Sequence, residues 1–203
     1  MNIGGLWLGA LSDSDRADLL ARARISTTTY DHVGSTLDPA RWEGAAVHVQ
    51  AVDVGVGPVA FDAAREALRT WVAQRGIGAE VVPPECRVAV DETLVIVLRR
   101  GPLYVLAPDR VVAVIYEPRR FAFAYGTLAG HPERGEESFE VARLADETVR
   151  VTIRVQAGPG TLAAQLVAPV VRVLQRAALR GYLKAISQYV AAAVAAHDPK
   201  EVQ

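Results

Sequence analysis

The feature of this sequence that most constrains its fold is a long run of alternating apolar and polar residues from Arg87 to Ala157. A period of two residues is typical of β-strands with one buried face. Short polar or Gly/Pro connections, such as Arg100-Gly101-Pro102, interrupt the run. Parallel neighbours would need crossovers of about a dozen residues or more, so the sequence predicts a mostly antiparallel sheet.

One predicted strand differs sharply between its two faces. Phe121, Phe123 and Tyr125 place rings on one face, whereas Ala and Gly occupy the alternate positions. Very small side chains on a strand allow a helix or a ligand to approach the backbone closely, and we favour a packed helix. The predicted strands are Val47–Val54, Arg87–Val90, Leu94–Arg99, Leu103–Ala107, Val111–Glu117, Arg120–Leu128, Ser138–Leu144 and Val149–Ala157.

Helical periodicity is found outside this run. A short helix is predicted at residues 15–23, and a second helix over Phe61 to Val72. A long amphipathic helix is predicted from Thr161 to Ala196, with a break near Gln165 because Pro169 interrupts the pattern. The residues of its apolar stripe that we expect to be buried against the sheet include Leu166, Val170, Leu174, Ile186 and Val190.

Composition narrows the class of protein. The 203 residues are 51 % hydrophobic and 22 % charged, which predicts a single domain over residues 1–203, with its core at about 29–196 and a frayed tail at 197–203. A net charge of -1 gives no basic field for nucleic acid, so no nucleic-acid partner is expected. The lone Cys86 excludes an intramolecular disulfide and indicates a reducing compartment. Since neither a signal peptide nor a transmembrane segment is recognisable, we expect a soluble cytoplasmic protein and leave a homodimer open.

The motifs of the common nucleotide-binding, hydrolase and zinc-protease sites are absent from the sequence, so no cofactor and no metal is predicted. The densest polar cluster runs from Tyr125 to Glu137 and places His131 near three carboxylates. Such groups could serve as acid/base partners or as metal ligands. A Gly/Pro/Glu/Arg stretch between two strands is more typical of a solvated hairpin, which is the interpretation we favour.

A site can nevertheless be predicted for the case that the protein has a chemical function. Tyr125 ends the row of rings and Thr127 continues its face, so both would border the mouth of a cavity. The following turn would fold His131 and Glu133 over the opening, where the carboxylate would raise the pKa of the imidazole. The catalytic candidates are therefore His131, Tyr125 and Glu133, and the ligand-binding candidates are Tyr125, Thr127, His131, Tyr30 and Tyr182.

Several segments resemble the signature of domain-of-unknown-function family nineteen-ninety, with matches from about Thr29 to Ile186. This resemblance implies a fold similar to the START and birch-pollen-allergen superfamily and brings no established activity. Strand, helix, antiparallel meander and long terminal helix is also the element order of that helix-grip fold. The matching segments are Thr29–Thr36, Gly55–Phe61, Arg110-Val111-Val112, Phe121–Leu128, Gly130-His131-Pro132-Glu133, Gly135–Phe139, Pro169–Gln175 and Tyr182.

The predicted fold class is thus α+β, a START-like helix-grip in which a curved antiparallel sheet surrounds a long C-terminal helix. Such a fold leaves a cavity between sheet and helix, although a fold does not fix a function. We favour binding of a hydrophobic small molecule, such as a lipid, an isoprenoid or a polyketide-like compound. The alternatives are a cofactor-independent enzyme resembling cyclases and dehydratases, which a strongly shifted pKa in the cavity would favour, and an interaction protein whose side chains fill the cavity.

Overall fold

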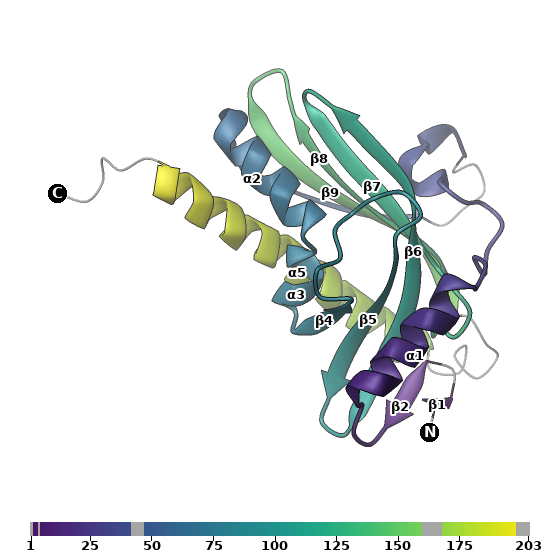
Figure 1. Cartoon of the computed structure of the whole chain (residues 1–203). Helices are drawn as coiled ribbons and strands as arrows, with labels where there is room; N and C mark the ends of the chain where they lie inside the picture. The colour runs from purple at the N-terminus through teal and green to yellow at the C-terminus, as the bar shows by residue number, and fades with distance from the viewer. Residues whose placement is uncertain (1, 4, 42–46, 160–167, 198–203) are drawn as a thin grey trace.

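The strands of the period-two run lie in one antiparallel sheet (Figure 1). The computed structural model describes residues 2–3, 5–41, 47–159 and 168–197, and of residues 168–176 the backbone alone. The strands are β1 (Asn2–Ile3), β2 (Leu6–Leu8), β3 (His48–Val56), β4 (Ala79–Val82), β5 (Thr93–Arg100), β6 (Leu103–Glu117), β7 (Arg120–Thr127), β8 (Glu133–Arg143) and β9 (Thr148–Pro159). Their order is β1-β2-β6-β7-β8-β9-β3, and β5 pairs with β6 and carries β4 at its other edge.

Both faces of the sheet are covered, and by different parts of the chain. Helices α2 (Gly57–Arg69), α3 (Val72–Gly76) and α5 (Ala168–His197) pack on one face, which we call the helix-covered face (Figure 1). Helix α1 (Asp13–Arg24) and the 3₁₀ turns η1 (Ser35–Leu37) and η2 (Pro39–Arg41) belong to the N-terminal segment, and α1 packs on the opposite face.

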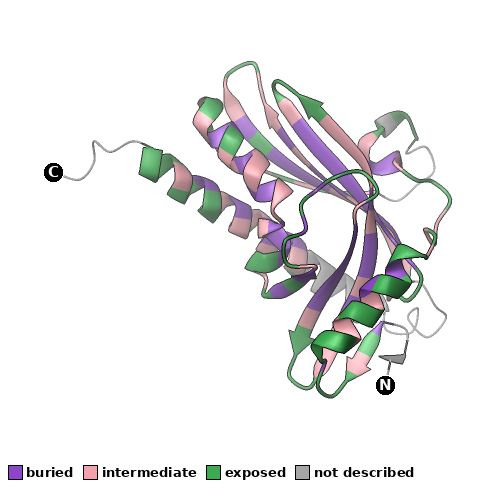
Figure 2. Cartoon of the chain, viewed as in Figure 1, coloured by how far each residue is buried: buried purple, intermediate pink, exposed green. Residues whose placement is uncertain are grey.

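The side chains of strand β5 contribute to the hydrophobic cores on both faces of the sheet. Leu94 and Ile96 belong to the core under α2 and α5, whereas Val95 and Val97 belong to the core under α1. A strand buried on both faces loses the polar alternation of a half-exposed one, and Figure 2 shows the resulting buried band through the middle of the sheet. The predicted α+β helix-grip fold is confirmed, with the N-terminal segment as an additional cover on its outer face.

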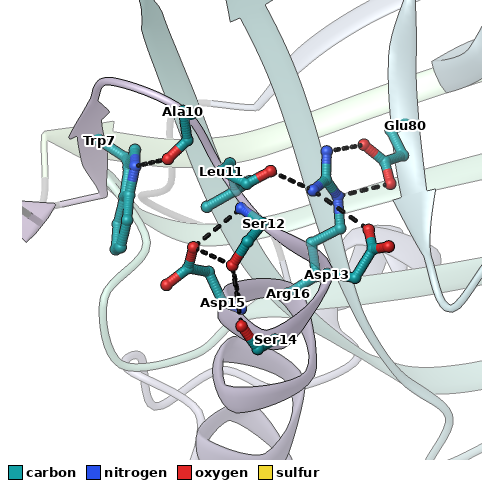
Figure 3. Close-up of polar contacts among 9 residues, drawn as sticks. All are labelled: Trp7, Ala10, Leu11, Ser12, Asp13, Ser14, Asp15, Arg16 and Glu80. Carbon is teal, nitrogen blue, oxygen red and sulfur yellow. Dashed lines mark hydrogen bonds and ion pairs between the residues drawn. The ribbon is translucent and has the colours of Figure 1, made fainter.

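Helix α1 confirms the short helix predicted at residues 15–23, and its start is specified locally (Figure 3). The Ser12 side chain accepts a hydrogen bond from the Asp15 backbone N–H at 3.2 Å, and the Asp15 carboxylate accepts one from the Ser12 N–H at 2.8 Å. This reciprocal pair is a capping box. Arg16 then joins the helix to β4 through two hydrogen bonds to the Glu80 carboxylate, at 2.9 and 3.1 Å.

Two strand predictions are wrong in instructive ways. Arg87–Val90 is a loop, and β4 takes the expected place beside β5. The apolar–polar alternation in this segment reflects the burial of Val88. The Val88 N–H donates to the Arg69 carbonyl at the end of α2, and not to a neighbouring strand. The two strands predicted on either side of Pro108 form one continuous strand, β6, whose register shifts between Val111 and Ala113.

The helix predictions hold in position and differ in extent. The second helix ends at Arg69, because Trp71 adopts a left-handed backbone conformation with φ 61° before α3 begins. In α5, Ile186 and Val190 are fully buried as predicted. The break expected near Gln165 and the side chains of Leu166, Val170 and Leu174 lie outside the described residues. No helix in the described part of the chain is long and apolar enough to cross a membrane.

Candidate functional site

The helix-covered face changes from apolar to polar along strands β7, β8 and β9. Phe121 pairs across the sheet with Val141, and Phe123 with Phe139. The next row pairs Tyr125 with Glu137, and beyond it Thr127 pairs with Asp109 of β6. Since side chains alternate between faces, these rows share one surface and place acidic groups at its far end.

Aromatic rings fill the apolar part of this face. The Phe139 ring stacks on Phe123 at a centroid distance of 5.3 Å, and the Trp71 ring meets Phe123 edge-on at 5.3 Å. From α5, the Tyr182 ring lies 5.8 Å from Phe139. Tyr125 extends the stack at 6.0 Å from Phe139. The rings therefore form a continuous apolar wall that ends at the acidic groups.

Six residues meet at this end and form what we call the buried acid cluster. These residues influence one another's pKa. The carboxyls of Glu137 and Glu133 contribute to the raised pKa of Asp109, and all three carboxyls contribute to the raised pKa of the Tyr182 phenol. No positively charged side chain is among them. The members of the cluster are Asp109, Tyr125, His131, Glu133, Glu137 and Tyr182.

Tyr125 and Glu137 form the central hydrogen bond of the cluster. The Tyr125 hydroxyl donates to Glu137 Oε2, and Gln74 Nε2 of α3 lies 3.4 Å from the same hydroxyl. Burial raises the pKa of Glu137 to about 8, although the bond from Tyr125 opposes the shift. Burial also raises the pKa of Tyr125 well above its usual value, with the charge of Glu137 adding to the effect. Near neutral pH, Glu137 is therefore mainly a protonated acid.

Asp109 is the least satisfied member of the cluster. Its side chain is 1 % exposed, and neither carboxylate oxygen has a hydrogen-bond partner. His131 Nε2 lies 3.8 Å from Oδ1, which is too far for a hydrogen bond. Burial raises the pKa of Asp109 well above its usual value, and the charges of Glu137 and Glu133 act in the same direction. A buried carboxyl without partners is unusual in a folded protein.

His131 is held in one orientation by the turn before β8. Its Nδ1 lies 2.8 Å from the backbone nitrogen and 3.0 Å from the carbonyl oxygen of Glu133, while its Nε2 faces Asp109. Burial lowers the pKa of His131 to about 4. We expected the Glu133 carboxylate to raise the pKa of His131. The pKa is lowered instead, because the loss of hydration on burial outweighs the opposing effect of the hydrogen bond with the Glu133 backbone.

The structure brings together most of the residues predicted for a site. Tyr125, His131, Glu133 and Tyr182 all belong to the buried acid cluster. The His131 side chain is only 11 % exposed, so the solvated-hairpin interpretation does not hold for it. Thr127 lies beside the cluster, but its hydroxyl is engaged by Thr29 and by the Gly135 N–H, at 2.6 and 3.0 Å.

Sequence reasoning did not single out Asp109 or the role of Glu137. The sequence offered one indication of Asp109: it is an acidic residue close to Leu106 and Val111, which are apolar and buried in the same strand. Glu137 stands directly opposite Tyr125 only because β7 and β8 pair in this register. A pattern along one strand cannot supply that pairing.

Tyr30, the remaining predicted ligand-binding residue, lies on the opposite face of the sheet. Its hydroxyl donates to Glu136 Oε2 at 2.7 Å, and the backbone N–H groups of Gly34 and Thr36 donate to the same carboxylate at 2.6 and 2.9 Å. A Cβ on Gly126 would come within 2.0 Å of the Tyr30 hydroxyl. The lack of a side chain at Gly126 therefore makes room for the Tyr30 ring, and not for a helix or a ligand.

Two surface hollows are also lined by described residues, most of which are of polar type. One, of about 420 Å³, lies between the end of α1 and the start of β5, and its lining includes Arg24 and Arg110. The other, of about 230 Å³, is lined in part by Tyr30 and Arg134. Within the described residues, no group of three or more His, Cys, Asp or Glu side chains is placed to hold a metal ion.

The raised pKa of Glu137 predicts that stability falls between pH 6.5 and pH 8. Its proton is bound more tightly in the folded state, so its stabilising contribution is complete below pH 4.5 and is lost as the pH rises through about 8. His131 has the opposite effect on stability, because its pKa falls from 6.5 to about 4 on folding. That effect is confined to pH values below about 6.5, outside this window. In urea unfolding we expect a loss of up to about 1.4 kcal/mol per pH unit across this window.

Glu137→Gln tests the assignment, because an amide mimics the protonated acid. This variant should show a shallower loss of stability from pH 6.5 to pH 8. Glu80→Gln, on the exposed edge strand, should keep the parent slope. A parent protein whose free energy of unfolding is constant over this window would contradict the assignment.

The family model described as Domain of unknown function (DUF1990) matches residues 29–185. A UPF0548 protein of Deinococcus radiodurans is 31 % identical over 182 residues, which cover 83 % of this chain and 90 % of that protein. The matched region includes strands β3 to β9, α2, α3 and most of α5.

Among solved structures, the hypothetical protein jhp0584 of Helicobacter pylori superposes with a TM-score of 0.55 at 12 % identity, covering 81 % of this chain and 99 % of that one. Protein Ms6760 of Mycobacterium smegmatis gives a TM-score of 0.50 at 12 % identity, covering 73 % and 93 % of the two chains. At these identities the likeness concerns the fold alone.

Proposed function

This chain belongs to the DUF1990 family, and on that premise we propose that it binds a small organic molecule on the helix-covered face of its sheet. The apolar part of the ligand, of lipid, isoprenoid or polyketide-like character, would lie along the ring wall that ends at Tyr125 and Tyr182. Its polar part would lie at the buried acid cluster. Ligand sites commonly combine an apolar lining with a few convergent polar groups.

The observation that carries this proposal is the unsatisfied carboxyl of Asp109. Leaving a buried polar group without a partner costs about 1–3 kcal/mol, so such groups persist mainly where they serve a purpose. Both oxygens of Asp109 lie in the cluster that Tyr125 and Glu137 complete. A ligand that donates hydrogen bonds there would remove the penalty.

Binding can be measured before the natural ligand is known. Native mass spectrometry of the purified protein would reveal a co-purified small molecule. The neutral dye N-phenyl-1-naphthylamine should gain fluorescence on the ring wall, and 1-octanol should displace it. If no molecule co-purifies and the dye does not bind, the side chains themselves fill this face and the binding proposal fails.

Tyr125→Phe should weaken competition by 1-octanol about fivefold, because one hydrogen bond contributes about 1 kcal/mol. The dye itself should bind as it does to the parent, since it needs only the ring wall. Tyr189→Phe is the matched control: this tyrosine lies on the same helix as Tyr182 but is 39 % exposed. If 1-octanol competed equally well in Tyr125→Phe and Tyr189→Phe, the ligand's polar contact would not be with Tyr125.

Acid/base catalysis on the bound molecule is the second candidate function. The raised pKa of Glu137, to about 8, favours it, because a carboxyl that stays protonated near neutral pH can act as a general acid. In a dehydration, this acid would protonate the leaving hydroxyl while a base removes the α-proton, and water would depart. Incubation with a β-hydroxy ketone should then give a product lighter by one water, and Glu137→Gln should abolish its formation.

A further inference from the structure

We propose that the ligand of the buried acid cluster is an organic cation, a protonated amine whose ammonium group binds the carboxylate of Asp109 while its apolar part lies on the ring wall. This inference rests on the proposed function and names the chemical class of the ligand. It is carried by the unpartnered carboxyl of Asp109 and by the charges of the groups around it.

Every group that faces Asp109 within the described residues is acidic or neutral. Strand β7 contributes Tyr125, the following turn His131, and strand β8 Glu133 and Glu137. Helix α5 contributes Tyr182. None of these groups offers Asp109 a positive charge, because His131 is neutral near pH 7.

The neighbouring arginines are engaged on the other face of the sheet. Arg110 follows Asp109 in β6, but its guanidinium donates to Thr93 Oγ1 at 3.0 Å and to the Arg24 carbonyl at 3.0 Å. Arg134 is exposed and lines the small hollow beside Tyr30. Among the side chains that the structure describes, none places a positive charge beside Asp109, and a cationic ligand would supply one to the ionised carboxylate.

An ammonium group fits this site better than the alternatives. It has three donors, which can serve Asp109 and the oxygens of Tyr125 and Glu137 together. A carboxylate or phosphate ligand would face three acidic side chains, and an alcohol has only one donor. The ring faces of Tyr182 and Phe139 beside the cluster can also attract a cation.

Binding of the cation is coupled to a proton. Because burial and acidic neighbours raise the pKa of Asp109, the ligand-free protein keeps the proton of this carboxyl to a higher pH than an exposed aspartate would. The ammonium ion replaces that proton, which leaves to solvent, so the carboxyl becomes a carboxylate and charge is balanced. Amine affinity should therefore increase with pH until the amine itself loses its proton, near pH 10 for an alkylamine.

The test compares ligands of one chain length by displacement of N-phenyl-1-naphthylamine at pH 7. Octylamine should compete at least tenfold better than 1-octanol, and octanoate should be the weakest. In Asp109→Asn, octylamine and 1-octanol should compete within about twofold of each other. Asp18→Asn is the matched control, since this exposed aspartate lies on α1 across the sheet, and it should keep the parent preference.

Calorimetry of the parent protein provides a measurement that does not depend on a variant folding. Titration of octylamine at pH 7 in phosphate and in Tris, which differ in ionisation enthalpy, should show release of up to one proton per amine bound. The inference is overturned if 1-octanol competes as well as octylamine, if Asp109→Asn keeps the amine preference, or if no proton is released. In each of these cases dye binding still supports the proposed function, whereas absence of dye binding rejects both.

Discussion

Glu136→Ala is expected to lower the free energy of unfolding by roughly 3 kcal/mol or more. The Glu136 side chain is 2 % exposed and accepts hydrogen bonds from Tyr30, Gly34 and Thr36. Hydrogen bonds to a charged group contribute about 1.5–3 kcal/mol each, and the donors left behind would remain partly buried without a partner. Equilibrium unfolding in urea measures the loss.

Three further variants separate this network from a general surface effect. Tyr30→Phe removes one hydrogen bond and should cost about 1 kcal/mol. Gly126→Ala should displace Tyr30, since the added Cβ would lie 2.0 Å from the Tyr30 hydroxyl. Glu80→Ala, which removes an exposed ion pair with Arg16, should cost less than about 1 kcal/mol.

The location of the effect is as informative as its size. Loss of the Glu136 network should increase hydrogen exchange in residues 30–36 before the rest of the sheet opens, because Tyr30, Gly34 and Thr36 would lose their hydrogen bonds to β8. Equal stability of Glu136→Ala and the parent would show that the N-terminal segment is held by other contacts.

Ile186→Ala is expected to cost about 2–5 kcal/mol, the range for removing a large side chain from a core. Ile186 is fully buried where α5 meets the core of the helix-covered face. Val194→Ala on the same helix is the matched control. Val194 is 38 % exposed, so its truncation should change stability by no more than about 0.5 kcal/mol. If the two variants had equal stability, α5 would not pack through the predicted stripe.

The candidate site was partly predictable. Rings and small residues alternate along Phe121 to Gly126, and that pattern alone assigned Tyr125 to an inner face. His131 and Glu133 were predicted to fold over this face, and they do lie beside it. Asp109 was missed because a single acidic residue in a strand has no periodicity of its own.

The fold was predicted where the signal is local. Periods of two and of helical spacing depend on neighbouring residues, so they predicted the antiparallel sheet and the terminal helix correctly. The same signal failed at Arg87 to Val90, where burial of Val88 beneath the end of α2 produced a strand-like alternation in a loop.

The sequence by itself determined the α+β class, the positions of most strands and the buried stripe of α5, because each follows from the spacing of apolar residues along a short segment. Only the tertiary structure decided which polar groups meet. Tyr30 and Glu136 are 106 residues apart, and Tyr125 meets Glu137 through the register of β7 on β8. A shift of that register by one residue would send the Glu137 side chain to the opposite face, so the chemistry of the site depends on pairing between strands that no single segment encodes.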